Sequence, residues 1–104
     1  MTDQDRRILL NRMLEELLGS NNVYFQPPSN ARMQYPCIVY EREDLSIKHA
    51  NNVPYNVSTS YSVTLIDPNP DSSVVGKIAA LPKCSFRRHF TTSGLNHDVF
   101  ILHF

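Results

Sequence analysis

The side chains best suited to acid–base or metal chemistry are concentrated near the C-terminal end of the sequence. His89, His97, Asp98 and His103 supply imidazole and carboxylate groups, the usual transition-metal ligands and proton carriers. Neighbouring residues of a strand point to opposite faces, so His97 and Asp98 should diverge. His89 and His103 can approach each other across a hairpin, but two ligands without a third do not complete a site. We therefore expect exposed or hydrogen-bonded structural histidines, with no bound metal and no cofactor.

A second pattern, Asp67-Pro68-Asn69-Pro70-Asp71, places oxygen donors at alternate positions, as at the start of a calcium loop. Ser72 stands where such a loop needs glycine, and Ile78 stands where it needs glutamate. The segment is instead predicted to be a turn that leads from a strand into a helix capped by Asp71.

Nucleophilic catalysis is not indicated either. Cys37 and Cys84 alternate with apolar residues in strand-like runs, and neither has the local signature of a thiol activated by histidine. With 3 glycines in the chain, no glycine-rich phosphate loop or oxyanion turn can be recognised. We therefore predict no catalytic residue and a protein that is not an enzyme. Two cysteines are too few for a disulfide framework, which favours reduced thiols and a cytosolic site of synthesis.

Composition limits the partners. A length of 104 residues predicts a single domain, 1–104, and the formal net charge of +0 disfavours DNA as the main ligand. Arg87, Arg88 and His89 lie between Phe86 and Phe90, a pattern that suits single-stranded nucleic acid but also a protein interface, where arginine is enriched. The neutral net charge of the chain favours the protein interface over nucleic-acid binding. The polar start of the chain lacks the pattern of a signal peptide, and no apolar run is long enough for a membrane span.

The hydrophobic pattern predicts the elements that position these side chains. Residues 3–18 form an amphipathic helix, residues 23–33 a connector, and residues 35–42 a strand. Leu45 and Ile47 are compatible with a further strand that leads into the polar tip His49–Pro54. Further predictions are a long alternating strand at 55–66, a helix at 71–81, and a hairpin of 84–91 and 98–104 with its turn at 92–94.

This order of elements predicts an α+β fold: an antiparallel or mixed β-sheet with two helices packed on one face and a long protruding β-hairpin. Two short helices cover only one face, yet the segments around Ile38 and Val99 are apolar on both. We therefore expect a neighbouring subunit to cover part of the second face. The predicted assembly interface combines the hairpin tip with the arginine strand: His49, Ala50, Asn51, Asn52, Val53, Pro54, Tyr55, Arg87 and Arg88.

Several sequence strings, taken together, resemble a known family. They are Asn22-Val23-Tyr24-Phe25-Gln26-Pro27-Pro28, Tyr35-Pro36-Cys37-Ile38-Val39-Tyr40-Glu41-Arg42, Tyr61-Ser62-Val63-Thr64-Leu65-Ile66-Asp67-Pro68-Asn69-Pro70-Asp71, Leu81-Pro82-Lys83-Cys84-Ser85-Phe86 and Leu95-Asn96-His97-Asp98-Val99-Phe100. With the opening helix they cover nearly the whole chain. The sequence is similar to the small head-to-tail joining proteins of long-tailed siphophages, often called tail completion or tail terminator proteins.

The resemblance implies a non-enzymatic virion protein, made in the host cytoplasm, that forms a hexameric ring at the head-proximal end of the tail. Its partners would be other copies of itself, the tail tube protein and the head connector or stopper protein, with DNA passing through the ring without specific contacts. The free protein would be a monomer if the ring needs the tube as a template. The alternative is a free-standing regulatory domain that binds peptides or proteins by strand addition.

Overall fold

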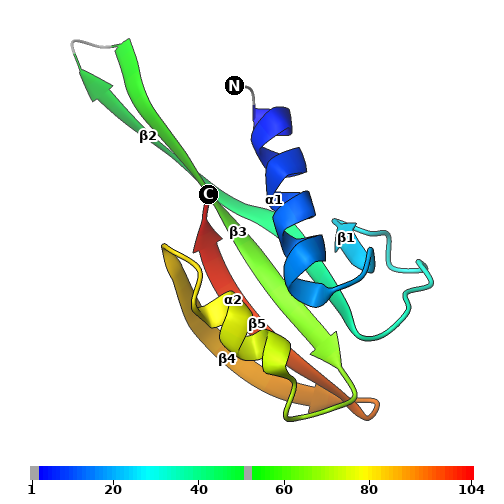
Figure 1. The fold of residues 1–104 in the computed structure, drawn as a ribbon. Coiled ribbons are helices and arrows are strands. Elements are labelled where there is room, and N and C mark those ends of the chain that lie inside the picture. Colours follow the sequence, from blue (N-terminus) through cyan, green and yellow to red (C-terminus); the bar gives the residue numbers. More distant parts are fainter. Residues whose placement is uncertain (1–2, 51–52) are drawn as a thin grey trace.

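The computed structural model describes residues 3–50 and 53–104 (Figure 1). The described side chains exclude those of 44–58 within the two longest strands. Two helices and a five-stranded mixed sheet form an α+β fold, with the strand order β1-β2-β3-β5-β4. Both helices lie on the same face of the sheet in Figure 1 and pack into one hydrophobic core.

The first helix, α1, spans Asp3–Leu18, as the spacing of its apolar residues predicts. Leu10 and Leu14 are fully buried against the sheet. The helix ends at Gly19, whose φ of 81° is the left-handed conformation that glycine adopts readily. The Gly19 backbone N–H donates to the Glu15 carbonyl at 2.9 Å and so closes the last turn.

Strand β1, Val23–Phe25, corrects the prediction that this segment is only a connector. It runs parallel to β2, Cys37–Ala50, with Val23 opposite Ile38 and Phe25 opposite Tyr40. The strand is short because Pro27 and Pro28 follow it and cannot donate backbone hydrogen bonds to a ladder. It is recognisable only through this pairing, since three residues show no periodicity of their own.

Strands β2 and β3, Val53–Asp67, are antiparallel partners along their whole described length, from Cys37↔Ile66 to Ala50↔Val53. The predicted strands at 35–42 and 45–47 are therefore one strand. β3 also pairs with β5, but only from Ser60 to Asp67. Beyond Ser60 the two strands have each other as their only strand partners within the described chain. The predicted protruding hairpin stays a prediction, because residues 51–52 of its predicted tip lie outside the described residues.

The turn from β3 into α2 is built from side-chain oxygens, and it differs from the prediction at its cap. The Asp67 carboxylate accepts from the Asn69 N–H at 2.8 Å, and the Asn69 side-chain oxygen accepts from the Asp71 N–H at 3.0 Å. Such local bonds favour turns over helix. Helix α2 spans Ser73–Ala79, and its cap is Ser72, whose hydroxyl accepts from the Val74 N–H. Asp71 is thus used within the turn, so the helix is shorter than predicted at both ends.

The C-terminal hairpin consists of β4, Cys84–Thr92, and β5, Leu95–His103. Its turn is the pair Ser93-Gly94, with φ of 53° and 74°, the positive values that a tight two-residue hairpin turn requires. The turn was predicted at 92–94 and the last strand from residue 98, but β5 already begins at Leu95; the segment Leu95-Asn96-His97 lacks the apolar alternation that would have predicted it. As predicted, β5 is an interior strand, between β3 and β4.

Tyr40 joins the helix layer to the sheet. It is fully buried and lies beside Phe25, at 5.0 Å between ring centroids, and Tyr61, at 6.0 Å. Its hydroxyl donates to the Asn11 side-chain oxygen at 2.7 Å, and burial raises the Tyr40 pKa. The sequence pattern placed Asn11 on the polar side of the helix, away from the sheet. Its amide oxygen instead satisfies a buried hydroxyl.

The packing of α1 leads to a prediction about stability. Leu14 is fully buried and Leu17 is half-buried, so Leu14→Ala should lower the free energy of unfolding by about 2–5 kcal/mol and Leu17→Ala by less. Leu9 is 44% exposed on the same helix and serves as the control, with Leu9→Ala expected within about 0.5 kcal/mol of the parent. Urea denaturation of the three variants measures the differences. Equal stabilities for Leu14→Ala and Leu9→Ala would contradict the packing of this helix.

Candidate functional site

The face of the sheet opposite the helices contains a groove of about 320 Å³. Ser62, Thr64 and Val99 of the two central strands form its floor. Strand β2 supplies acidic side chains on one side, and β4 supplies basic and aromatic ones on the other. The lining residues are Glu41, Glu43, Ser62, Thr64, Arg87, Arg88, Phe90 and Val99.

An ion pair between Glu43 and Arg87 crosses this groove. The two residues belong to β2 and β4, with β3 and β5 between them. Three strand spacings amount to about 14 Å, so both side chains must extend over the floor of the groove to meet. Val99, in the floor of the groove, is 6% exposed although it faces away from the helices.

Both partners of the ion pair occupy irregular positions in their strands. The ladder between β2 and β3 shifts register between Arg42 and Asp44, which makes Glu43 the extra residue. The ladder between β4 and β5 shifts between Phe86 and Arg88, which makes Arg87 the extra residue. A β-bulge redirects the side chain of its extra residue and bends the strand. Two bulges therefore aim the two opposite charges at each other.

Strand β4 presents aromatic and cationic side chains next to one another. Phe90 stacks on His97 with ring centroids 4.6 Å apart, and the Arg88 guanidinium lies 5.1 Å from the Phe90 ring centre. Phe86 is on the helix side of the sheet, where it forms an edge-to-face contact with Phe100, with ring centroids 5.5 Å apart. Phe86 and Phe90 remain 55% and 37% exposed. Arginine and aromatic residues in this arrangement are typical of protein interfaces.

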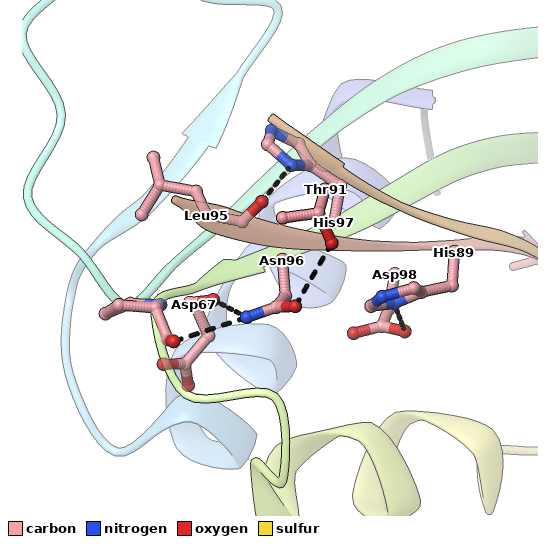
Figure 2. A network of polar contacts seen from close by, with 8 residues as sticks. Asp67, His89, Thr91, Leu95, Asn96, His97 and Asp98 are labelled. Carbon is pink, nitrogen blue, oxygen red and sulfur yellow. Dashed lines mark hydrogen bonds and ion pairs between the residues drawn. The ribbon is translucent and has the colours of Figure 1, made fainter. Parts of the chain in front are cut away.

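The cluster of histidines forms structural contacts (Figure 2). His89 and Asp98 are cross-strand partners, and their Nδ1 and Oδ1 atoms are 2.8 Å apart. The Asn96 amide donates to the backbone carbonyls of Asp67 and Pro68, each at 3.2 Å, and so ties the hairpin end to the turn before α2. His97 points away from Asp98, as predicted from their adjacency in the chain.

Neither metal binding nor thiol chemistry is supported by the arrangement of these groups. In the part of the chain that the structure describes, no three His, Cys, Asp or Glu side chains come together as metal ligands. His103 lies opposite Ser60, at the other end of β5 from His97, and does not join His89. Burial raises the pKa of the Cys37 thiol to about 11 and also raises that of Cys84, so both thiols stay protonated near neutral pH.

The residues of the predicted interface fall in two places. His49 pairs with Pro54 and Ala50 with Val53 at the far end of the β2–β3 ladder, with Tyr55 beside them in β3. Asn51 and Asn52 lie outside the described residues, as do the side chains of the whole tip. Arg87 and Arg88 line the groove, with Glu41 and Glu43 of β2, and are not among the residues paired at the far end of the β2–β3 ladder.

The acidic wall of the groove was missed from the sequence. Glu41 and Glu43, which form this wall, follow an apolar strand segment without a turn signal, in a run of charges that resembles the end of a strand. A run of charges at a break in alternation can mark a bulge, and that signal was available. It could not reveal Arg87 as the partner, since 44 positions separate Arg87 from Glu43.

The need for a neighbouring subunit on the second face is smaller than predicted. Val99 is 6% exposed within the single chain, and Cys37 and Ile66, opposite each other on this face, are 0% and 7% exposed. The Tyr24 hydroxyl accepts from the Gln34 N–H at 3.3 Å, which holds the segment of residues 26–36 beside the sheet. Apolar coverage alone therefore does not require a partner.

No family model matches this sequence, and no significant match is found among curated proteins. Among the described residues, no helix has the length and apolar character needed to cross a membrane. The functional conclusions therefore depend on the fold, the groove and the sequence strings themselves.

The ion pair leads to a prediction about the groove. The Arg87 and Glu43 side chains are 52% and 32% exposed, so solvent screening should limit their coupling to about 0.2–1 kcal/mol. A double-mutant cycle with Arg87→Met and Glu43→Gln measures this coupling, which should shrink as salt is added. Additive effects of the two substitutions at low salt would show that the charges are not paired.

The thiols lead to a prediction about labelling. Cys37 is fully buried and has a pKa of about 11, whereas Cys84 is half-buried, so iodoacetamide should modify Cys84 first in the folded protein. The raised pKa means that the unfolded chain loses the Cys37 proton first. The contribution of Cys37 to stability should therefore fall as the pH rises from 9.0 to about 11. Mass spectrometry of the parent and of Cys84→Ser follows the labelling, and rapid modification of Cys37 in the folded protein would contradict its burial.

Proposed function

We propose that this chain is a virion structural protein of a long-tailed bacteriophage. It forms a ring of copies, hexameric by the resemblance, at the head-proximal end of the tail, completes the tail and joins it to the head connector. It has no enzymatic role and needs no cofactor. In the assembled particle it contacts the tail tube protein on one side and the connector or stopper protein on the other, and DNA passes through the ring.

The observation that carries this proposal is the length of β2 and β3 beyond the rest of the sheet. Their ladder continues to Ala50↔Val53, whereas β5 ends its pairing with β3 at Ser60. The molecule is accordingly elongated, with extents of 52 × 24 × 23 Å (Figure 1). This arm, the part of β2 and β3 beyond the Ser60 pairing, has no further strand of the described chain beside it. Contact with another chain would account for its length.

The surface of the sheet supports assembly better than catalysis. Its groove combines two glutamates, two arginines and an exposed phenylalanine, with polar residues on the floor. This mixture suits an interface between proteins, where arginine and aromatic residues are enriched. A neutral total charge suits a ring that lets DNA pass without holding it.

A second candidate function is a free-standing domain that binds peptides or proteins by strand addition. The observation that favours it is β4, an edge strand of nine residues whose outer side has no strand partner within the described chain. The two functions differ in assembly. A joining protein becomes part of the virion and forms rings on tail tubes, whereas a peptide-binding domain stays apart from the particle.

Complementation of a phage that lacks this gene tests the proposed function. Removal of residues 50–53 shortens the arm at its predicted tip, and loop tips tolerate shortening, so the fold should survive. The variant should have the same melting temperature as the parent, but it should fail to join heads to tails. The matched control is insertion of Gly-Ser after Ser93, in the turn between β4 and β5, which lies away from the arm. This insertion should preserve the joining of heads to tails. Normal titres of infectious particles from the deletion variant would exclude the arm as the joining element.

A further inference from the structure

The two outer edges of the sheet are closed to different degrees. At the β1 edge, β2 is covered by β1 from Ile38 to Tyr40. The Gln26 N–H then donates to the Tyr40 carbonyl, and the Gln26 side-chain oxygen accepts from the Arg42 N–H. Beyond Arg42 the outer side of β2 has no strand partner in the described part of the chain. At the opposite edge, the outer side of β4 has no strand partner along its whole length in the described part of the chain.

Charged residues and a bulge on β4 would also be expected if this edge were built to prevent pairing. The exposed phenylalanines argue against that interpretation. Phe86 and Phe90 flank the arginines on opposite faces of β4, and they are 55% and 37% exposed. An edge built only to repel other strands gains nothing from two exposed aromatic rings, whereas an interface does.

The charges of β4 are complementary to those at the start of the free part of β2. β4 carries Arg87 and Arg88, and Lys83 directly precedes it. The free part of β2 begins with Glu43 and Asp44, next to Glu41 and Arg42, and carries Lys48 near its far end. The same kinds of side chain already attract each other within one molecule, in the Arg87–Glu43 pair. Opposite charges on neighbouring strands stabilise their pairing, and like charges oppose it.

From these features we propose that β4 of one copy of this chain adds to the free edge of β2, beyond Arg42, in a second copy. The resulting sheet runs continuously from one molecule into the next. A two-fold arrangement, with β4 against β4, would instead bring the arginine pairs of two copies together. The charges thus select a head-to-tail contact between different edges, which closes into a ring when the rotation between copies permits. This inference deepens the proposed function, since it assigns the ring contact to particular strands.

Two double variants test the contact while leaving the internal Arg87–Glu43 pair intact. The first, Lys83→Glu with Arg88→Glu, makes the β4 edge acidic. The second, Glu41→Lys with Asp44→Lys, makes the β2 edge basic. Their controls carry the same charge changes on the exposed residues of the helices and turns: Arg12→Glu with Lys77→Glu, and Glu16→Lys with Asp71→Lys. Circular dichroism melts establish that all four variants fold.

Sedimentation and native mass spectrometry of the purified full chain then measure self-association, up to about 1 mM, where weak interfaces are populated. Each edge variant alone should associate about tenfold more weakly than the parent and its control, because two favourable cross-strand pairs become repulsive. An equimolar mixture of the two edge variants should recover association, with the copies alternating.

Three results would overturn the proposal. A parent chain that stays monomeric at every concentration would show that these edges do not pair. Unimpaired association of the β2-edge variant alone would indicate a contact that does not use β2, such as the two-fold one. If the mixture of the two edge variants associates no more strongly than either variant alone, pairing between these two edges is excluded. None of these results bears on the joining of heads to tails, which the complementation experiment measures separately.

Discussion

The arrangement of this domain depends on a buried tyrosine that needs a hydrogen-bond partner. Tyr40 lies in β2, between Phe25 of β1 and Tyr61 of β3, and its ring is fully removed from water. A hydroxyl in such a place is costly unless it is hydrogen-bonded. Asn11 accepts this bond and is itself held by a donor bond of 2.7 Å to Glu15. The register of α1 on the sheet follows, because a rotation of the helix would leave the hydroxyl without a partner.

The second face of the sheet carries a charged groove, whereas the main hydrophobic cluster lies on the helix side. Val99 lies in the floor of this groove, and the ion pair reaches across the two central strands. Each partner is the extra residue of a bulge, so the backbone irregularities and the pair form one feature. A surface pair of this kind adds little stability. Its effect is on shape: it places the acidic base of the β2–β3 arm and the basic edge of β4 against the same groove.

An elongated subunit with unlike edges is well suited to repeat in a ring. Each copy would present one basic edge strand and one acidic edge. Two edges of the same charge would repel each other, so neither would pair with its equivalent in another copy. In the proposed ring, assembly by unlike edges would have a direction. Edges that carry charge are also less prone to uncontrolled aggregation than apolar ones.

The sequence by itself determined the α+β class, the span of α1, the interior position of β5 and the sharing of one sheet face by both helices. These features are encoded locally, by apolar residues that recur with the period of a helix or a strand. It also indicated that His97 and Asp98 point apart, because adjacent strand residues do so in any fold.

Only the tertiary structure decided the features that depend on pairing between distant segments. β1 exists as a strand because Ile38 and Tyr40 lie beside it, and its three residues carry no pattern of their own. The partner of Arg87 is Glu43 because the strand order and two bulges bring them together, and a bulge is visible only in the register between two strands. The local sequence specifies the period of an element, whereas the identity of its neighbours follows from how all the elements pack at once.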